Sequence, residues 1–186
     1  MNWYCDFAPG DPLHGPYHDD IYGFPLTDEA ALFERLALEI FQAGLSWHVT
    51  LMKQPTTVQA FDGFVVDRVA AYRAREINRL LKNPGIIRNR RKVEAIIENA
   101  KRLQAIRKSH GGFADWIVAH HPRSKNEWVT LFRATFLFMG GEVVNEFLMS
   151  IGYLPGVHRE DCPVFKRLAR LRPPWMRVDP KIYRRR

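Results

Sequence analysis

The spacing of the apolar residues constrains the fold of this chain more than any other feature of its sequence. Within residues 28–44 apolar side chains recur every three or four positions, as on one face of an amphipathic helix; they are Leu32, Phe33, Leu36, Ile40 and Phe41. Thr27 is the expected N-cap, and Asp28 and Glu29 follow it where the helix dipole favours carboxylates. No segment shows the sustained period-two alternation of a half-buried strand. The sequence therefore predicts an all-α fold.

The same spacing predicts further helices, separated by proline and glycine. Residues 45–52 are expected to be helical up to an interruption at Pro55, and residues 57–81 to form two short helices. A long amphipathic helix is expected from Asn89 to about Lys108. The remaining predicted helices are near residues 113–121, 127–139 and 142–151.

The basic residues are concentrated in two segments. The formal net charge is +8, and residues 81–110 carry nine Lys and Arg against two Glu, while residues 166–186 carry nine against Asp179. Two positive zones on an otherwise acidic body favour a polyanionic partner held in one place. We expect a single domain at residues 1–165 and a basic tail at 166–186. A solvated tail without a partner is an equally good interpretation of the second segment.

Hydropathy and cysteine content exclude several classes of protein. No run approaches the roughly 20 apolar residues that cross a bilayer, and the N-terminus lacks the layout of a signal peptide, so we expect a cytoplasmic protein without membrane contacts. The two cysteines, Cys5 and Cys162, are too few for the disulfide framework of a small secreted protein. A single disulfide between them stays open.

These cysteines also belong to a possible metal site. His158 and Cys162 have the i, i+4 spacing that puts two side chains on one side of a helix or turn, and Cys5 and His18 lie in a Pro/Gly-rich segment. Together they would form a closed Cys₂His₂ site, which is typical of structural zinc. The alternative is two reduced thiols and two ordinary histidines, and spacing also leaves other candidates: His14, His48, His110, His120 and His121.

One carboxylate interrupts an apolar helix face. In a helix over residues 28–44, Glu39 lies on the stripe of Leu32 and Leu36, where an ionised group is costly unless it is paired or faces a polar cavity. The nearby aromatic residues are Phe7, Tyr17, Tyr22 and Trp47. They would form a pocket for a flat, electron-poor or cationic ring. In the alternative interpretation the helix is rotated, Glu39 is exposed and the aromatic residues are core.

Residues 80–92 have the form of helix, turn, helix, with Asn83-Pro84-Gly85 at the turn. Helix N-termini with free N–H groups and nearby Arg and Lys suit a phosphate backbone; the candidates are Gly85, Ile87, Arg88, Arg90 and Lys92. Many helical hairpins contain Pro-Gly for purely mechanical reasons, which is the alternative.

Several strings in this order resemble the DNA-3-methyladenine glycosylase I family of helix-hairpin-helix base-excision glycosylases. They include Tyr17-His18-Asp19, QAGLSW at residues 42–47, GIIRNR at residues 85–90, and His158 four residues before Cys162. The similarity covers roughly residues 3–162.

The resemblance implies an activity and a set of site residues. It implies one structural zinc ion bound by Cys5, His18, His158 and Cys162, and a flipped base recognised by Glu39, Tyr17 and Trp47. Phe7 and Tyr22, which belong to the aromatic pocket expected above, would add further contacts to the base. A loop with Gln42, Gly44 and Leu45 would enter the gap that the flipped base leaves in the duplex. The DNA backbone would be bound by the turn and helix start with Gly85, Ile87, Arg88, Arg90 and Lys92. The implied reaction is hydrolytic excision of 3-methyladenine from double-stranded DNA, without strand cleavage. We also expect a monomer without a nucleotide cofactor, although the sequence itself carries no signal for the oligomeric state.

The chain departs from the family pattern at several positions near the expected pocket. Ile21-Tyr22 replaces Glu-Trp, Phe7 replaces a tryptophan, His14 replaces an aromatic residue, and residues 138–142 read Phe-Met-Gly-Gly-Glu in place of Phe-Val-Gly-Pro-Thr. Glu142 has no assigned role. Two alternatives therefore stay open: excision of a different alkylated purine, and a zinc-stabilised DNA-binding module without excision activity.

Overall fold

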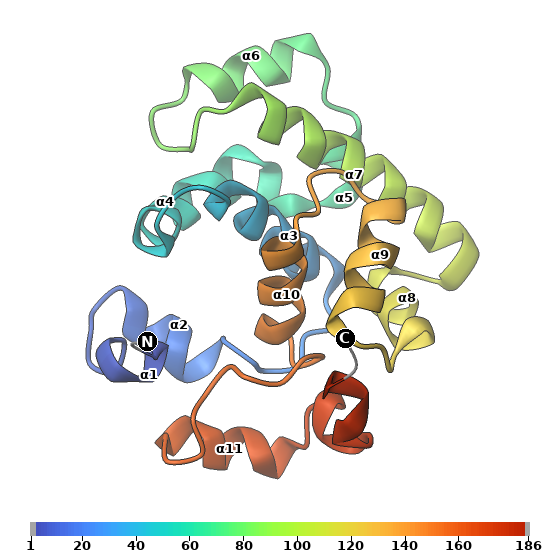
Figure 1. Ribbon diagram of the computed structural model, residues 1–186. Coiled ribbons are helices and arrows are strands. Elements are labelled where there is room, and N and C mark those ends of the chain that lie inside the picture. Colours follow the sequence, from blue (N-terminus) through green and yellow to red (C-terminus); the bar gives the residue numbers. More distant parts are fainter. Residues whose placement is uncertain (1–2, 185–186) are drawn as a thin grey trace.

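Figure 1 shows the computed structural model, which describes residues 3–184. Its central helix is α3 (Glu29–Gln42), whose predicted apolar stripe is buried at every position. The N-cap is Asp28, whose side chain accepts a hydrogen bond from the Ala31 amide at 2.8 Å, so the prediction of Thr27 is wrong by one residue. Both Thr and Asp can cap a helix, and here the Asp28 carboxylate is the group that reaches the free amide of the first turn.

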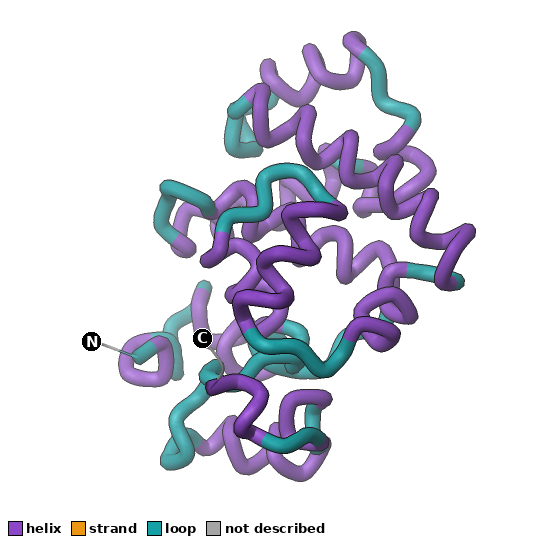
Figure 2. Tube along the Cα trace, turned by 45° about the vertical axis from the view of Figure 1, so that its right-hand side comes forward, coloured by secondary structure: helices purple, strands orange, loops and turns teal. Residues whose placement is uncertain are grey.

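The helices around α3 form the larger of two cores. In contact with α3 are α4 (Trp47–Ala60), α5 (Val66–Ala70), α7 (Arg90–His110), α8 (Phe113–His120), α10 (Gly141–Ser150) and the 3₁₀ turn Asp62–Phe64. Two further helices pack outside these: α6 (Ala74–Lys82) against α7, and α9 (Lys125–Thr135) against α10. No strand occurs within residues 3–184, as Figure 2 shows, so the all-α prediction is confirmed.

Pro55 does not interrupt α4, contrary to the prediction. The helix continues from Trp47 to Ala60 with Pro55 inside it. Proline removes one intrahelical hydrogen bond. Buried residues on both sides of Pro55, Leu51 before it and Thr57 and Ala60 after it, hold the two halves of α4 on the molecule. Tertiary packing therefore outweighs the local cost.

Both terminal segments are helical, and they meet in the lower part of Figure 1. The N-terminal segment, which looked loop-like, contains α1 (Tyr4–Phe7) and α2 (His14–Asp20), and the C-terminal segment contains α11 (Pro163–Leu171) and the 3₁₀ turns Pro174–Arg177 and Pro180–Arg184. Leu168 is fully buried in a second, smaller core with Tyr17, Tyr22, Leu51 and Val157. The expected boundary between residues 165 and 166 falls inside α11. Arg185 and Arg186 lie outside the described residues.

Two glycines allow the terminal segments to come close. Gly23 has φ +91°, its amide donates to the Ser150 carbonyl at 2.8 Å, and a Cβ there would lie 2.8 Å from the Val157 side chain. Gly152 has φ +78°, and its Cβ would lie 2.9 Å from both the Gly23 carbonyl and Pro173. A side chain at either position would push the N-terminal and C-terminal segments apart.

Within residues 3–184 we find no helix with the length and hydrophobicity needed to cross a membrane.

Candidate active site

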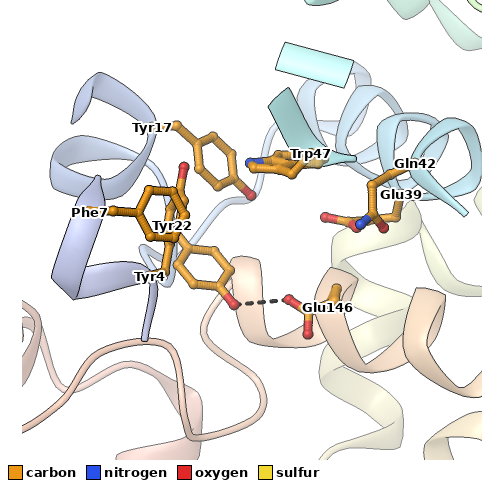
Figure 3. Close-up of a pocket in the computed structure, with 8 residues that line it drawn as sticks. All are labelled: Tyr4, Phe7, Tyr17, Tyr22, Glu39, Gln42, Trp47 and Glu146. Carbon is orange, nitrogen blue, oxygen red and sulfur yellow. Dashed lines mark hydrogen bonds between the residues drawn. The ribbon is translucent and has the colours of Figure 1, made fainter. Parts of the chain in front are cut away.

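A cavity opens between the N-terminal helices and the α3, α4 and α10 side of the molecule (Figure 3). Its volume is about 210 Å³, below the roughly 300–1,000 Å³ of sites for drug-sized ligands, so it suits a single flat ring system. The lining residues are Tyr4, Phe7, Tyr17, Tyr22, Glu39, Gln42, Trp47 and Glu146. All five residues expected to contact a base are among them, together with Gln42. Sequence reasoning missed Tyr4 and Glu146.

Glu39 is the most buried carboxylate of this cavity. Its side chain projects from α3 toward the cavity and is 3% exposed, so the interpretation of Glu39 as a surface residue is wrong. Burial raises its pKa to about 8, with the negative charge of Glu146 contributing to the rise and Arg35 opposing it. Without a bound cation the carboxyl therefore keeps its proton to a higher pH than an ordinary glutamate. A positively charged ligand would stabilise its ionised form.

Aromatic rings form the wall opposite Glu39 (Figure 3). Tyr17 and Tyr22 stack with ring centroids 5.6 Å apart, and Trp47 meets Tyr17 edge-on at 5.0 Å. Burial raises the pKa of Tyr17, so its hydroxyl stays protonated, and this buried hydroxyl has no hydrogen-bond partner among the described residues. It is a free donor for a ligand. Phe7 is 54% exposed and lies at the rim.

Glu146 supplies a second carboxylate. It projects from α10, and the Tyr22 hydroxyl donates to its Oε2 at 2.9 Å (Figure 3). The Asn145 amide donates to its Oε1 at 3.3 Å. The sequence carried little signal for it, because Glu146 is one polar position of an amphipathic helix. The guanidinium of Arg35 lies over the Tyr17 ring at 5.3 Å from its centre. Two carboxylates and a set of aromatic rings thus favour a flat cation in the cavity.

Glu142, the other unassigned acid, lies outside this cavity. Its side chain is 80% exposed at the start of α10 and pairs with Lys125 at 3.0 Å.

A cluster that could hold a metal ion lies next to the aromatic wall. It consists of Cys5, His18, His158 and Cys162. Their donor atoms all lie within 4.8 Å of one another. The Cys5 sulfur lies 3.6 Å from His158 Nδ1, and the Cys162 sulfur lies 3.8 Å from both His18 Nε2 and His158 Nδ1. Donors around a tetrahedral zinc ion lie about 3.3–3.8 Å apart. The predicted four residues are thus brought together, both cysteines are free, and no disulfide joins them.

The outer nitrogens of both histidines are also bound. His18 Nδ1 lies 2.6 Å from an Asp19 carboxylate oxygen, and His158 Nε2 lies 3.0 Å from the Tyr22 carbonyl. Such partners orient metal-binding imidazoles and fix their tautomers. Each ring therefore presents its other nitrogen to the two sulfurs. The five remaining histidines are not part of this cluster.

The predicted backbone-gripping turn joins α6 to α7 through residues 83–89. Two residues of α4 fix it: Lys53 Nζ donates to the Pro84 carbonyl at 2.7 Å, and Thr56 Oγ1 donates to the Gly85 carbonyl at 2.5 Å. Arg88 and Arg90 are exposed, whereas Ile87 and Gly85 are half-buried. In the other predicted DNA-contacting segment, Gly44 and Leu45 are exposed next to the cavity residue Gln42.

Lys92 was expected to contact DNA, and the structure contradicts this. The residue is 4% exposed, and its ammonium donates to the carbonyls of Phe41 at 2.8 Å and Ala43 at 2.6 Å. These carbonyls lie at the end of α3, where intrahelical donors run out. Burial lowers the pKa of Lys92, and the two carbonyls satisfy its charge. Sequence spacing could not separate this lysine from the exposed arginines beside it.

Substitutions at Lys92 and Arg88 should therefore affect different properties, stability at Lys92 and DNA binding at Arg88. We expect Lys92→Met to lower the free energy of unfolding by about 1–3 kcal/mol in a denaturant titration, because two buried carbonyls lose their donor. Arg88→Ala should leave stability unchanged and reduce the slope of log K against log salt for duplex DNA by about 0.9, one lost phosphate contact. An unchanged slope would remove Arg88 from the DNA interface.

The fold is that of a class of proteins with known members, the 3-methyladenine DNA glycosylases. The solved structure of 3-methyladenine DNA glycosylase I from Staphylococcus aureus aligns with a TM-score of 0.76 and 33% identity, over 87% of this chain and 95% of that one. The model of the methyladenine glycosylase family matches residues 7–134. The chain belongs to the methyladenine glycosylase family.

Two curated relatives agree with this assignment. The DNA-3-methyladenine glycosylase of Haemophilus influenzae is 33% identical over 182 residues, which cover 88% of this chain and 98% of the relative. DNA-3-methyladenine glycosylase 1 of Escherichia coli K12 is 38% identical over 122 residues, 64% of this chain and 65% of the relative. The family match at residues 7–134 includes Glu39 and Trp47 but not Glu146.

Proposed function

We propose that this protein is an N-glycosyl hydrolase that extrudes 3-methyladenine from double-stranded DNA and excises it. The observation that carries the proposal is Glu39, a carboxylate buried in an aromatic cavity the size of one ring system. A nucleotide methylated at N3 of adenine carries a positive charge, which such a cavity favours over neutral adenine. The relatives' names support the same substrate, since both are DNA-3-methyladenine glycosylases.

In this mechanism the cavity residues bind and orient the extruded base. Trp47, Tyr17 and Tyr22 contact the ring faces and edges, and the ionised Glu39 accepts hydrogen bonds from the base and stabilises its charge. The glycosidic C–N bond breaks, the base leaves as a neutral molecule with the bonding electron pair, and a water oxygen bonds to the positively charged sugar carbon and releases one proton to solvent. The methyl group has already weakened this bond, so the protein supplies binding and orientation more than acid catalysis.

Exposed groups beside the cavity would hold the DNA. Gln42, Gly44 and Leu45 fill the gap left by the base, and the α6–α7 turn acts as a helix-hairpin-helix motif, with Arg88 and Arg90 at the backbone. No lysine lines the cavity among the described residues, so no imine with the sugar is formed and the strand is not cut. A covalent adduct trapped by borohydride would contradict this.

The metal cluster is proposed to bind one structural zinc ion. Two thiolates and two imidazoles are a closed donor set, and the Asp19 carboxylate and Tyr22 carbonyl support both histidines. The ion would fix the terminal segments and leave chemistry to the cavity. We propose that the chain acts as a cytoplasmic monomer without a nucleotide cofactor. We also propose that residues 166–184 belong to the glycosylase domain, because Leu168 packs in the small core with Tyr17.

The test is chromatography of the bases released from broadly methylated duplex DNA. We expect free 3-methyladenine and no shortened strands. A protein that binds this DNA but releases no base would be the DNA-binding module without excision activity.

A wider substrate range is the second candidate function. The observation that favours it is the second carboxylate of the cavity, Glu146. A methylated guanine cation has adjacent N1–H and N2–H donors, whereas adenine has only its amino group on that edge. Two carboxylates at one end of the cavity supply two acceptors. We expect the parent protein to release methylguanine as well. Glu146→Gln should lower methylguanine release about tenfold, as for the loss of one charge-assisted hydrogen bond, and 3-methyladenine release much less.

Tyr22→Phe is the matched variant, because it removes the donor that holds Glu146 and keeps the ring. Like Glu146→Gln, it should lower the ratio of released methylguanine to released 3-methyladenine, but to a smaller extent. Equal losses for both bases in Glu146→Gln, or no methylguanine from the parent, would restrict the substrate to 3-methyladenine.

A further inference from the structure

Two exposed apolar residues lie in the loop between α9 and α10. Leu137 is 39% exposed and Phe138 is 37% exposed. Phe138 also has φ +66°, a left-handed conformation that costs free energy for any residue with a side chain. The loop thus holds an aromatic ring partly in water and in an unfavourable backbone conformation.

A comparison within the chain shows that burial does not account for this conformation. Phe64 also has a positive φ, +55°, but its ring is completely buried and stacks on Phe61 at 5.1 Å. Packing therefore offsets the backbone cost at Phe64. Phe138 has much less of this compensation, and strain retained at an exposed residue is characteristic of functional sites.

The loop is also held rigidly. Asn99 of α7 accepts from the Leu137 amide at 2.8 Å and donates to the Leu137 carbonyl at 3.1 Å. Arg133 donates to the Met139 carbonyl at 3.1 Å, and Arg102 donates to the Thr135 carbonyl at 3.0 Å. The ring of Phe138 is therefore presented at a fixed place, so little side-chain and loop ordering would be required on binding.

Lys92 locates this ring beside the DNA-contacting loop. Its ammonium lies 5.9 Å from the centre of the Phe138 ring and 2.6 Å from the Ala43 carbonyl, immediately before Gly44 and Leu45. Leu45 is itself 43% exposed. The α7 helix that carries Lys92 begins at the turn with Arg88 and Arg90. The ring and the loop with Leu45 thus both lie near the start of α7, the helix that follows the arginine-bearing turn.

We propose that Phe138 is a second wedge residue, which stacks with Leu45 against bases uncovered when the lesion leaves the duplex. The partner is double-stranded DNA with an opened base stack, since apolar side chains enter unstacked steps and the exposed Arg88 and Arg90 at the start of α7 match phosphate charge. The inference rests on the proposed function for the identity of the DNA lesion, but it concerns binding and not excision.

Phe138→Gly tests the proposal, because glycine removes the ring and also relieves the positive φ. The measurement is the Kd for a duplex with one stable abasic analogue and for the same duplex undamaged. We expect about 5- to 100-fold weaker binding of the abasic duplex, as for loss of one base–aromatic stack, with less than about twofold change for the undamaged duplex. The melting temperature should not fall. Phe138→Trp should retain the affinity.

Val118→Ala is the control, since Val118 is 60% exposed on α8 and lies outside the cavity, both proposed DNA-contacting segments and the basic C-terminal segment. It should leave both Kd values unchanged. Equal losses on both duplexes, unchanged binding of the abasic duplex, or a fall in melting temperature that accounts for the loss would each overturn the role of Phe138. If the parent releases no 3-methyladenine while Phe138→Gly still weakens abasic binding, the proposed excision fails and the wedge stands.

Discussion

Glu39→Gln is expected to lower the single-turnover rate of 3-methyladenine release by about 100- to 1,000-fold, which is typical for removing one preorganised electrostatic group from an active site. Glutamine keeps the size of the side chain and can still form hydrogen bonds. It cannot supply the negative charge that a cationic base would stabilise. The rate of base release should therefore fall for charged lesions, while the affinity for undamaged DNA stays unchanged.

The pH dependence should identify the same carboxylate. Because the pKa of Glu39 is raised to about 8 in the free protein, kcat/KM of the parent should rise with pH toward about 8 and then level, whereas the Glu39→Gln variant lacks this step.

Stability should change in the opposite direction to activity. In the parent the folded state holds the Glu39 proton to higher pH than the unfolded chain, so stability falls as pH rises from about 4.5 toward 8. Glu39→Gln has no such penalty. Its melting temperature should exceed that of the parent at pH 8 and approach it near pH 4.5.

Glu142→Gln is the control for these measurements, because Glu142 is exposed and outside the cavity. It should preserve the rate of release and the pH profile. A Glu39→Gln protein that releases methyladenine as fast as the parent would refute the role given to the buried carboxylate.

Cys162→Ser is the second substitution with a large expected effect. We expect the purified parent to contain about one equivalent of zinc and the variant much less, since a structural site depends on all four ligands. The small core of Tyr17, Tyr22, Val157 and Leu168 should then loosen, while the larger core around α3 stays helical. Displacement of Tyr17 and Tyr22 from the cavity by about 1 Å should lower excision about 100-fold.

Metal analysis and circular dichroism check this result together. The control is His110→Ala, since His110 is exposed and not part of the cluster, and it should keep both zinc and activity. Less than about half an equivalent of zinc in a normally folded parent would refute the metal proposal.

The sequence predicted those elements in which local pattern and tertiary packing agree. The stripe of α3, the long α7 and the turn before it follow directly from apolar spacing and from Pro-Gly chemistry. Pro55 and Thr27 were misjudged because local propensity is a weak guide where buried neighbours hold a helix. The helices α1, α2 and α11 are short and depend on the contact between the two ends of the chain, which no local window contains.

The same reasoning explains what was found of the site. Glu39 stood out because a charged residue on an apolar stripe contradicts the pattern. Glu146 and Lys92 do not contradict any pattern, and their roles depend on Tyr22 and on the end of α3, both distant in the sequence. Phe138 could not be recognised as strained, because a left-handed residue has no sequence signal unless it is glycine or asparagine.

The meeting of the two ends also sets the order in which the protein can be completed during synthesis. Residues up to 150 contain almost all of the larger core, so this part can collapse while the chain is still on the ribosome. Tyr17 and Tyr22 are made long before their packing partners Val157 and Leu168. The cavity can therefore be completed only after Leu168 has emerged, and a nascent chain can be largely folded well before it can hold a base.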